Sequence, residues 1–140
     1  MGEGPEAASS PPPSRAIALI RRIAGPMWSR AGLTVVLTVP GRRTGTPRHV
    51  TLFPIEVEGT RYLLSQYGAC EWVRNLRAAR RGELRRRGRT EAIAVIEVDG
   101  PERDRVIAAF RAKVPPPLNW DFNTRPAAAD HPTFRVEPIR

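Results

Sequence analysis

Three runs rich in β-branched and aromatic residues follow one another between residues 33 and 67, and their succession constrains the fold more than any other feature. The runs are LTVVLTV (33–39), HVTLFPIEVEG (49–59) and RYLLSQY (61–67). Turn-favouring residues separate them at 40–41, 46–47 and 59–60, as is typical of consecutive strands. Further along, ELRRRGRTEAIAVIEV (83–98) predicts a strand pair that turns near Gly88, and TFRVEPI (133–139) predicts a closing strand. The sequence therefore predicts six strands.

Helical patterns lie around and between these strands. Ser14 is a plausible N-cap for a helix over residues 15–30 that ends or kinks at Gly25-Pro26. Two more helices are expected over 72–81, stopped by Gly82, and over 102–114. Because no βαβ rhythm links helices and strands, we expect an α+β fold: a six-stranded antiparallel barrel with two or three flanking helices. Residues 115–132 read as a long irregular connection.

The length of 140 residues predicts a single domain. Residues 1–13 are poor in apolar periodicity and are expected to be a disordered tail, which leaves the domain to residues 14–140. One cysteine excludes an internal disulfide, and two histidines show no metal-ligand spacing, so we expect no metal. The chain has neither a signal-like apolar segment nor an apolar run near 18 residues, which favours a cytoplasmic protein. The alternative is a peripheral membrane contact through the Arg-bearing N-terminal helix.

The positive charge is concentrated in two windows. The formal net charge is +9, and 22 of the 23 cationic residues are arginine. Residues 41–48 (GRRTGTPR) carry three arginines and no acid, and residues 72–89 carry eight arginines and one acid. The windows thus account for +3 and +7, and the remainder of the chain carries −1. This distribution predicts one basic site or face, although a GC-rich genome would also favour arginine.

The order of three segments resembles a known family. GRRTGTPR follows the first strand, SQYGACEWVRNLRAA follows the third, and RRRGRTEA comes next. Together they resemble the deazaflavin-dependent nitroreductases, with their G-R-x-[ST]-G-x-x-R and W-x-x-N-L-R-A patterns. The resemblance runs from about Leu33 to Val98 and implies a split β-barrel oxidoreductase that uses coenzyme F-420.

The resemblance also implies two groups of cofactor-binding residues. The anionic tail of the cofactor would meet the basic loop, at Arg42, Arg43, Thr44, Gly45 and Arg48. The deazaflavin ring would lie against the third strand and the next helix, at Ser65, Tyr67, Gly68, Trp72 and Asn75. Arg77 of the same helix is expected to join the loop arginines in binding the anionic end. Glycines allow close backbone approach to an anion and arginines supply forked donors. Trp72 could equally be a core residue. The side-chain amide of Asn75 needs hydrogen-bond partners, either backbone groups of the loop or the polar edge of the ring.

Hydride transfer asks the protein mainly to position and shield the ring. A proton source for the reduced substrate would be Tyr67 or Ser65, unless these are ordinary strand residues. The resemblance implies that the partner is a small-molecule acceptor such as a quinone, an enone or a nitroaromatic. We expect the acceptor to meet Met27 and Trp28 of the N-terminal helix and Trp120 and Phe122 of the later connection.

Three alternatives remain open at the level of sequence. A related barrel could bind flavin mononucleotide (FMN) instead, or could be a non-catalytic protein that holds a lipid or fatty acid. Nucleic-acid binding through RRGELRRRGR (80–89) is the least favoured, because this run lacks interleaved aromatic residues. The sequence is compatible with either a monomer or a homodimer.

Overall fold

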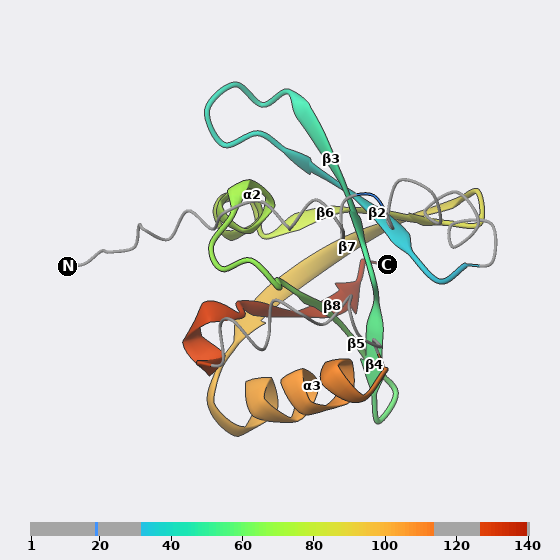
Figure 1. Cartoon of the computed structure of the whole chain (residues 1–140). Helices are drawn as coiled ribbons and strands as arrows, with labels where there is room; N and C mark the ends of the chain where they lie inside the picture. The colour runs from blue at the N-terminus through green and yellow to red at the C-terminus, as the bar shows by residue number, and fades with distance from the viewer. Residues whose placement is uncertain (1–18, 20–31, 114–126, 140) are drawn as a thin grey trace.

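The computed structural model of the protein describes residues 19, 32–113 and 127–139 (Figure 1). The predicted tail, the N-terminal helix over 15–30, and most of the irregular connection lie outside these residues, apart from Leu19. The expected acceptor contacts at Met27, Trp28, Trp120 and Phe122 lie outside them as well.

The first two described strands form a hairpin whose turn is the basic loop. β2 (Val35–Pro40) alternates buried and half-buried residues, and it pairs antiparallel with β3 (Pro47–Leu52). Pro40 lies opposite Pro47 at the end of the register, where neither strand needs another amide donor. The loop therefore begins where regular pairing ends.

The predicted strand over 49–59 is wrong as a single element. β3 ends at Leu52, and a separate strand, β4 (Ile55–Val57), follows after Phe53 and Pro54. Proline has no amide hydrogen to donate, which favours a break in the ladder at this point. β4 then forms a hairpin with β5 (Thr60–Leu64) through Glu58 and Gly59, both at positive φ. The described sheet therefore has seven strands rather than six.

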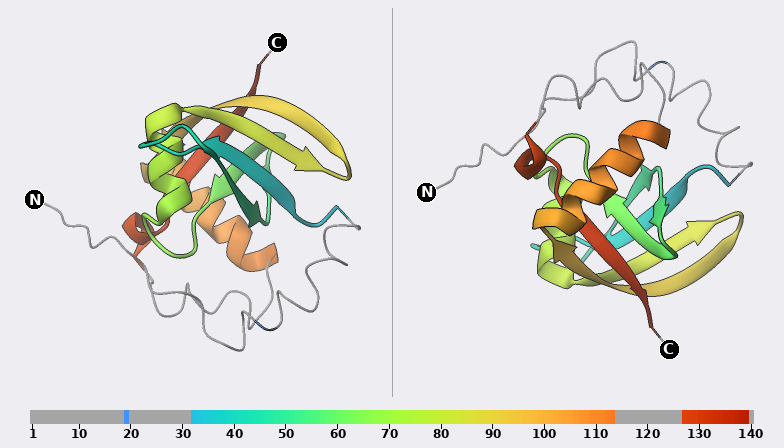
Figure 2. Two further views of the ribbon diagram at one scale, coloured as in Figure 1. Left: turned by 90° about the horizontal axis from the view of Figure 1, so that it is seen from above. Right: turned by 90° about the horizontal axis from the view of Figure 1, so that it is seen from below.

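The second strand pair is β6 (Arg81–Arg86) with β7 (Arg89–Val98), and β8 (Thr133–Pro138) completes the sheet. The turn at Arg87 and Gly88, with φ of 51° and 80°, confirms the predicted position. All pairings are antiparallel, in the order β3-β2-β6-β7-β8-β5-β4. The outermost strands, β3 and β4, are joined by two residues only, so the sheet has to curl until its edges approach each other. Figures 1 and 2 show this curled, partly open barrel, and the predicted α+β class is confirmed.

Two helices lie against the described barrel. α2 (Glu71–Ala79) buries Trp72, Val73 and Leu76 in the main core, and it ends two residues before its predicted limit because Arg80 adopts the left-handed conformation. α3 (Gly100–Lys113) packs Val106 and Phe110 into a second core beside β4 and β5. A short 3-10 helix, η1 (Ala128–Asp130), precedes β8. None of the helices in the described part of the chain is long and apolar enough to span a membrane.

Candidate active site

The basic loop between β2 and β3 is held by its own backbone. The amide of Gly41 donates to the carbonyl of Thr46 over 2.8 Å, and the amide of Gly45 donates to the carbonyl of Gly41 over 2.8 Å. Gly45 has a φ of 76°, in the region that favours glycine. The hydroxyl of Thr44 also accepts the amide of Thr46. The loop is therefore a defined turn that presents its arginines from a fixed frame.

Asn75 of α2 fastens this loop to the helix. Its Oδ1 accepts the backbone amide of Arg42 over 3.1 Å and the Arg42 Nη1 over 2.8 Å. Asn75 is only 5% exposed, so its amide oxygen requires such partners. The loop backbone, one of the two partners expected for this amide, is thus observed, and the contact with the ring stays a prediction. The two segments that the sequence linked by resemblance thus meet through direct hydrogen bonds.

Glu71, in the first turn of α2, also contacts Arg42. Nη1 of Arg42 lies 3.1 Å from Oε1 of Glu71, and Nη2 lies 3.4 Å from Oε2. The hydrogen bond from Arg42 keeps the pKa of Glu71 below its ordinary value. Among the described residues, no carboxylate lies within ion-pairing distance of Arg43 or Arg48. The loop therefore keeps two guanidinium groups available to an external anion.

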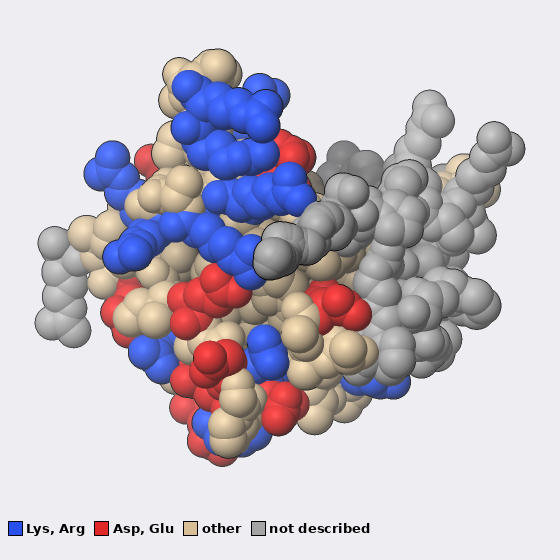
Figure 3. Space-filling model, turned by 90° about the vertical axis from the view of Figure 1, so that its left-hand side faces the viewer, with Lys and Arg blue, Asp and Glu red and all other residues tan. Residues whose placement is uncertain are grey.

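A cleft of about 270 Å³ lies between the loop and α2, and we call it the basic cleft. Its lining residues are Gly41, Arg42, Arg43, Thr44, Arg48, Glu71 and Asn75. Figure 3 views the molecule from the side of α2 and the β2–β3 loop, and Lys and Arg side chains crowd the upper part of that face. The predicted anion-binding residues are thus gathered around one concavity, apart from Gly45, which belongs to the same turn.

A second cleft, of about 480 Å³, continues from the first, and we call it the middle cleft. It shares Arg48, Glu71 and Asn75 with the basic cleft and adds His49, Val50, Cys70 and Trp72. Trp72 is 8% exposed, with its ring 6.0 Å from that of Phe134. Trp72 is thus a core residue that also lines a cleft, and its contact with a cofactor stays a prediction.

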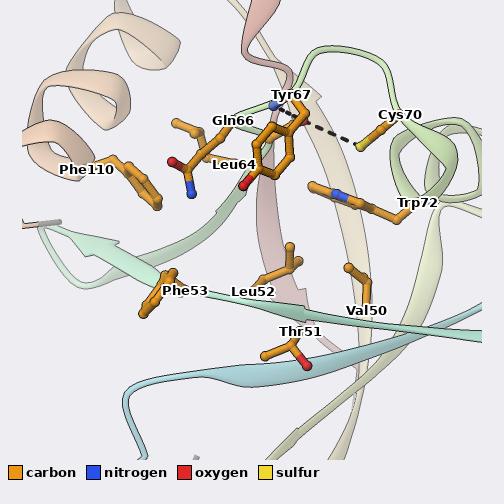
Figure 4. A pocket seen from close by; sticks show the side chains of 11 residues that line it. Val50, Thr51, Leu52, Phe53, Leu64, Gln66, Tyr67, Cys70, Trp72 and Phe110 are labelled. Atoms are coloured by element: carbon orange, nitrogen blue, oxygen red, sulfur yellow. Dashed lines mark hydrogen bonds between the residues drawn. The ribbon is translucent and has the colours of Figure 1, made fainter. Parts of the chain in front are cut away.

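A third and smaller cleft, of about 100 Å³, extends inward, and we call it the inner cleft. It shares Val50, Cys70 and Trp72 with the middle cleft, and Leu52, Phe53, Leu64 and Phe110 add an apolar wall. Gln66 and Tyr67 point into it from the loop after β5 (Figure 4). The three clefts therefore form one trough that is cationic at one end and apolar at the other.

The loop between β5 and α2 is held by Ser65. Its hydroxyl donates to the carbonyl of Gly68 over 2.6 Å and accepts the amide of Tyr67 over 3.2 Å. Gly68 has a φ of 75°. Fully buried His131 donates from Nδ1 to the carbonyl of Ser65 over 3.0 Å. The side-chain proton of Ser65 is thus engaged within the loop, whereas Tyr67 reaches the inner cleft.

The structure does not bring Arg77 to the trough. Its Nε and Nη2 donate to the two carboxylate oxygens of Glu97 on β7, each over 2.8 Å. The arginines at the tip of the β6–β7 hairpin lie at the opposite end of the molecule from α2 and the basic loop (Figures 1 and 2). The second basic window is therefore divided between helix and hairpin, and it contributes Trp72 and Asn75 rather than its arginines to the clefts.

Sequence reasoning missed four residues around the trough: Glu71, Cys70, Gln66 and His131. Glu71 precedes Trp72 by one residue and Asn75 by four, so helical spacing alone could have placed it beside Asn75. Cys70 lines the middle and inner clefts, and burial raises the pKa of its thiol. For Gln66 and His131 the sequence holds no comparable signal, because their positions depend on how the loop after β5 folds back.

The trough fits an elongated ligand that has anionic groups at one end and a planar ring at the other. Guanidinium groups offer forked donors to phosphate and carboxylate, and the walls of the middle and inner clefts are mainly apolar. A deazaflavin cofactor with an anionic tail has these two parts, so the residues present are compatible with it.

Comparison with known proteins agrees with this fit. Residues 17–125 match the sequence model of the F420H(2)-dependent quinone reductase family. Similar solved structures include an F420-H2 dependent reductase, FDR-A (21% identity, 75% of this chain and 94% of the other, TM-score 0.59). Another is described as a domain-swapped dimer (18%, 87% and 99%, 0.58), and a third as an FAD-binding protein from Mesorhizobium loti (16%, 84% and 89%, 0.52). No curated protein matches the chain significantly.

At these identities the solved structures establish the fold, and the family match carries the chemistry. The family match makes this small barrel an oxidoreductase. The chain belongs to the F420H(2)-dependent quinone reductase family, and its cofactor is the deazaflavin coenzyme F-420.

Proposed function

We propose that the protein holds reduced coenzyme F-420 along the trough and reduces a small acceptor of the quinone, enone or nitroaromatic type. The observation that carries this proposal is the continuity of the clefts. Arg48, Glu71 and Asn75 border both the basic and the middle cleft, so one ligand can place its charged tail at the loop while its ring lies beside Trp72.

At the basic end, the chain's part is to bind. Arg43 and Arg48 would donate charge-assisted hydrogen bonds to the tail, each worth about 1.5–3 kcal/mol. Two or three such bonds suffice to anchor a flexible anionic segment. A Cβ at Gly41 would lie 3.2 Å from the carbonyl oxygen of Thr46 and 3.5 Å from Nε of Arg48. The first contact is tight and the second ordinary, so a side chain at this position would require a small shift of the turn.

At the apolar end, the chain's part is to orient the ring and exclude water. When bound, the reduced deazaflavin supplies a hydride. Val50 and Trp72 would bracket the ring in the middle cleft, and the inner cleft would receive the acceptor. An apolar wall keeps water from the reacting faces, which strengthens every polar contact there.

For the proton that the reduced acceptor requires, we assign Tyr67 as donor. It lines the inner cleft, and a phenol can transfer a proton to a developing oxyanion within hydrogen-bond reach. Ser65, whose proton goes to the Gly68 carbonyl, is assigned the positioning of the loop that carries Tyr67.

The experiment that tests this function is a parallel titration of the purified protein with coenzyme F-420 and with FMN, followed by cofactor fluorescence. We expect saturable binding of F-420 and at least tenfold weaker binding of FMN. Oxidation of bound F-420H2 by a panel of quinones, enones and nitroaromatics would then identify the acceptor class. Tighter binding of FMN than of F-420 would overturn the proposal.

A further inference from the structure

Glu71 is the one carboxylate among the described residues that line the basic and middle clefts. Its carboxylate accepts two hydrogen bonds from the guanidinium of Arg42, over 3.1 and 3.4 Å. A carboxylate within a site for anions must either help to hold the ligand or compete with it. The geometry of the pair decides between these roles.

The two partners differ in their freedom to leave. The side chain of Arg42 is 21% exposed and that of Glu71 is 76% exposed. Arg42 is also held by Asn75 Oδ1 at both its backbone amide and its Nη1. Glu71 can therefore swing into solvent at little cost, whereas Arg42 stays directed at the cleft.

We propose that Glu71 is an internal counter-anion, which neutralises Arg42 in the empty cleft and is displaced when an anionic group of the ligand takes its place. This inference rests on the proposed function and deepens it, because it assigns a residue that sets affinity and selectivity at the anion end. A phosphodiester that displaces Glu71 forms its own ion pair with Arg42, at the cost of the exposed pair between Arg42 and Glu71. A neutral ligand would break that pair without replacing it, so the Arg42–Glu71 pair favours anionic ligands over neutral ones.

The test compares Glu71→Gln with wild type. An exposed ion pair contributes little and costs little to break, so removal of the competitor should tighten the binding of coenzyme F-420 about two- to fivefold, which corresponds to about 0.4–1 kcal/mol. The dissociation constant is measured by fluorescence titration. Inorganic pyrophosphate is used as a second probe of the same arginines, with binding followed by its effect on the melting temperature.

Glu97→Gln is the matched control, because it removes the carboxylate of another ion pair of α2, that with Arg77, away from the clefts. We expect it to leave both dissociation constants within twofold of wild type. Unchanged or weaker binding of both anions by Glu71→Gln would overturn the inference. Weaker binding would mean that the Glu71 carboxylate helps to hold the ligand, and unchanged binding would mean that it does not compete with the ligand for Arg42. If no variant binds F-420 while Glu71→Gln still binds pyrophosphate more tightly than wild type, the counter-anion role stands and the proposed function falls.

Discussion

Arg48 is the residue at which the anion-binding proposal is most directly tested, because it borders both the basic and the middle cleft. No carboxylate among the described residues lies within ion-pairing distance of it. A charge-assisted hydrogen bond of about 1.5–3 kcal/mol corresponds to at least a tenfold change in affinity. We therefore expect Arg48→Ala to weaken F-420 binding at least tenfold, measured by fluorescence titration, with little change in melting temperature.

Arg89→Ala is the control for this prediction, since it removes the same charge from the exposed hairpin tip, opposite Arg86. Equal losses of affinity in the two variants would mean that overall charge, rather than the basic cleft, attracts the cofactor.

Single residues could be predicted where a family-like motif carried them, and not where their partners depended on the tertiary fold. The resemblance assigned the loop arginines and Asn75 to one cofactor site, and the structure places them around one cleft, while their part in binding stays a prediction. Arg77 was assigned to that site with them, yet it lies two residues after Asn75, about 200° around a helix. Its side chain therefore leaves from the other side of α2 and meets Glu97. The pairing of Arg42 with Glu71 spans 29 positions and follows only from the tertiary fold.

Among the elements, β6 depends on a glycine. A Cβ at Gly82 would lie 2.7 Å from the backbone carbonyl oxygen of Thr38 on β2, closer than side chains tolerate. Gly82→Ala should therefore push β6 away from β2 and destabilise the protein by about 1–3 kcal/mol, measured by denaturant unfolding.

Glu83→Ala changes the next residue of the same strand and provides the control. Its side chain is exposed, so we expect a change within about 0.5 kcal/mol. A Gly82→Ala protein as stable as wild type would show that the two strands can separate without cost at this point.

The boundaries of helices and strands were predictable where the residue types at an end match the backbone conformation that the end adopts. The run of β-branched residues at 33–39 predicted β2, and Gly88 predicted the turn of the β6–β7 hairpin. The break at Pro54 was missed because apolar residues continue on both sides of it, so the pattern alone reads as one strand. The helix α2 was expected to run to Arg81 and stop at Gly82, but Arg80 ends it in a conformation that arginine seldom adopts.

At the scale of the whole molecule, ion pairs connect parts of the sheet that are distant in sequence. Arg61 of β5 contacts Glu91 of β7 over 2.7 and 2.8 Å. Glu102 of α3 accepts hydrogen bonds from Tyr62 over 2.7 Å and from Arg135 over 3.0 and 3.1 Å. These contacts join α3 and the closing strands to one another. They connect residues 30 to 40 positions apart, so no local sequence pattern predicts them.

The same contacts give the protein a predicted dependence on acid. The pKa of Glu91 lies below its ordinary value of 4.5 through the hydrogen bond from Arg61, and that of Glu102 lies below it through Tyr62 and then Arg135. A carboxyl group with a lowered folded-state pKa stabilises the folded state fully above the unfolded value, and this contribution is lost as the pH falls through the folded value. We therefore expect the free energy of unfolding to be steady from about pH 7 to 5 and to fall below about pH 4.5.

Denaturant unfolding between pH 7 and 3 measures this dependence, and Glu91→Gln isolates one contribution. The variant should be less stable than wild type at pH 7, because Arg61 loses its charged partner, and should lose less stability on acidification. Glu83→Gln, which alters a carboxylate with no ion pair in the described part of the chain, should follow the wild-type curve. Parallel curves for Glu91→Gln and wild type would contradict the assignment, because the difference between them has to shrink as Glu91 becomes protonated in the folded protein.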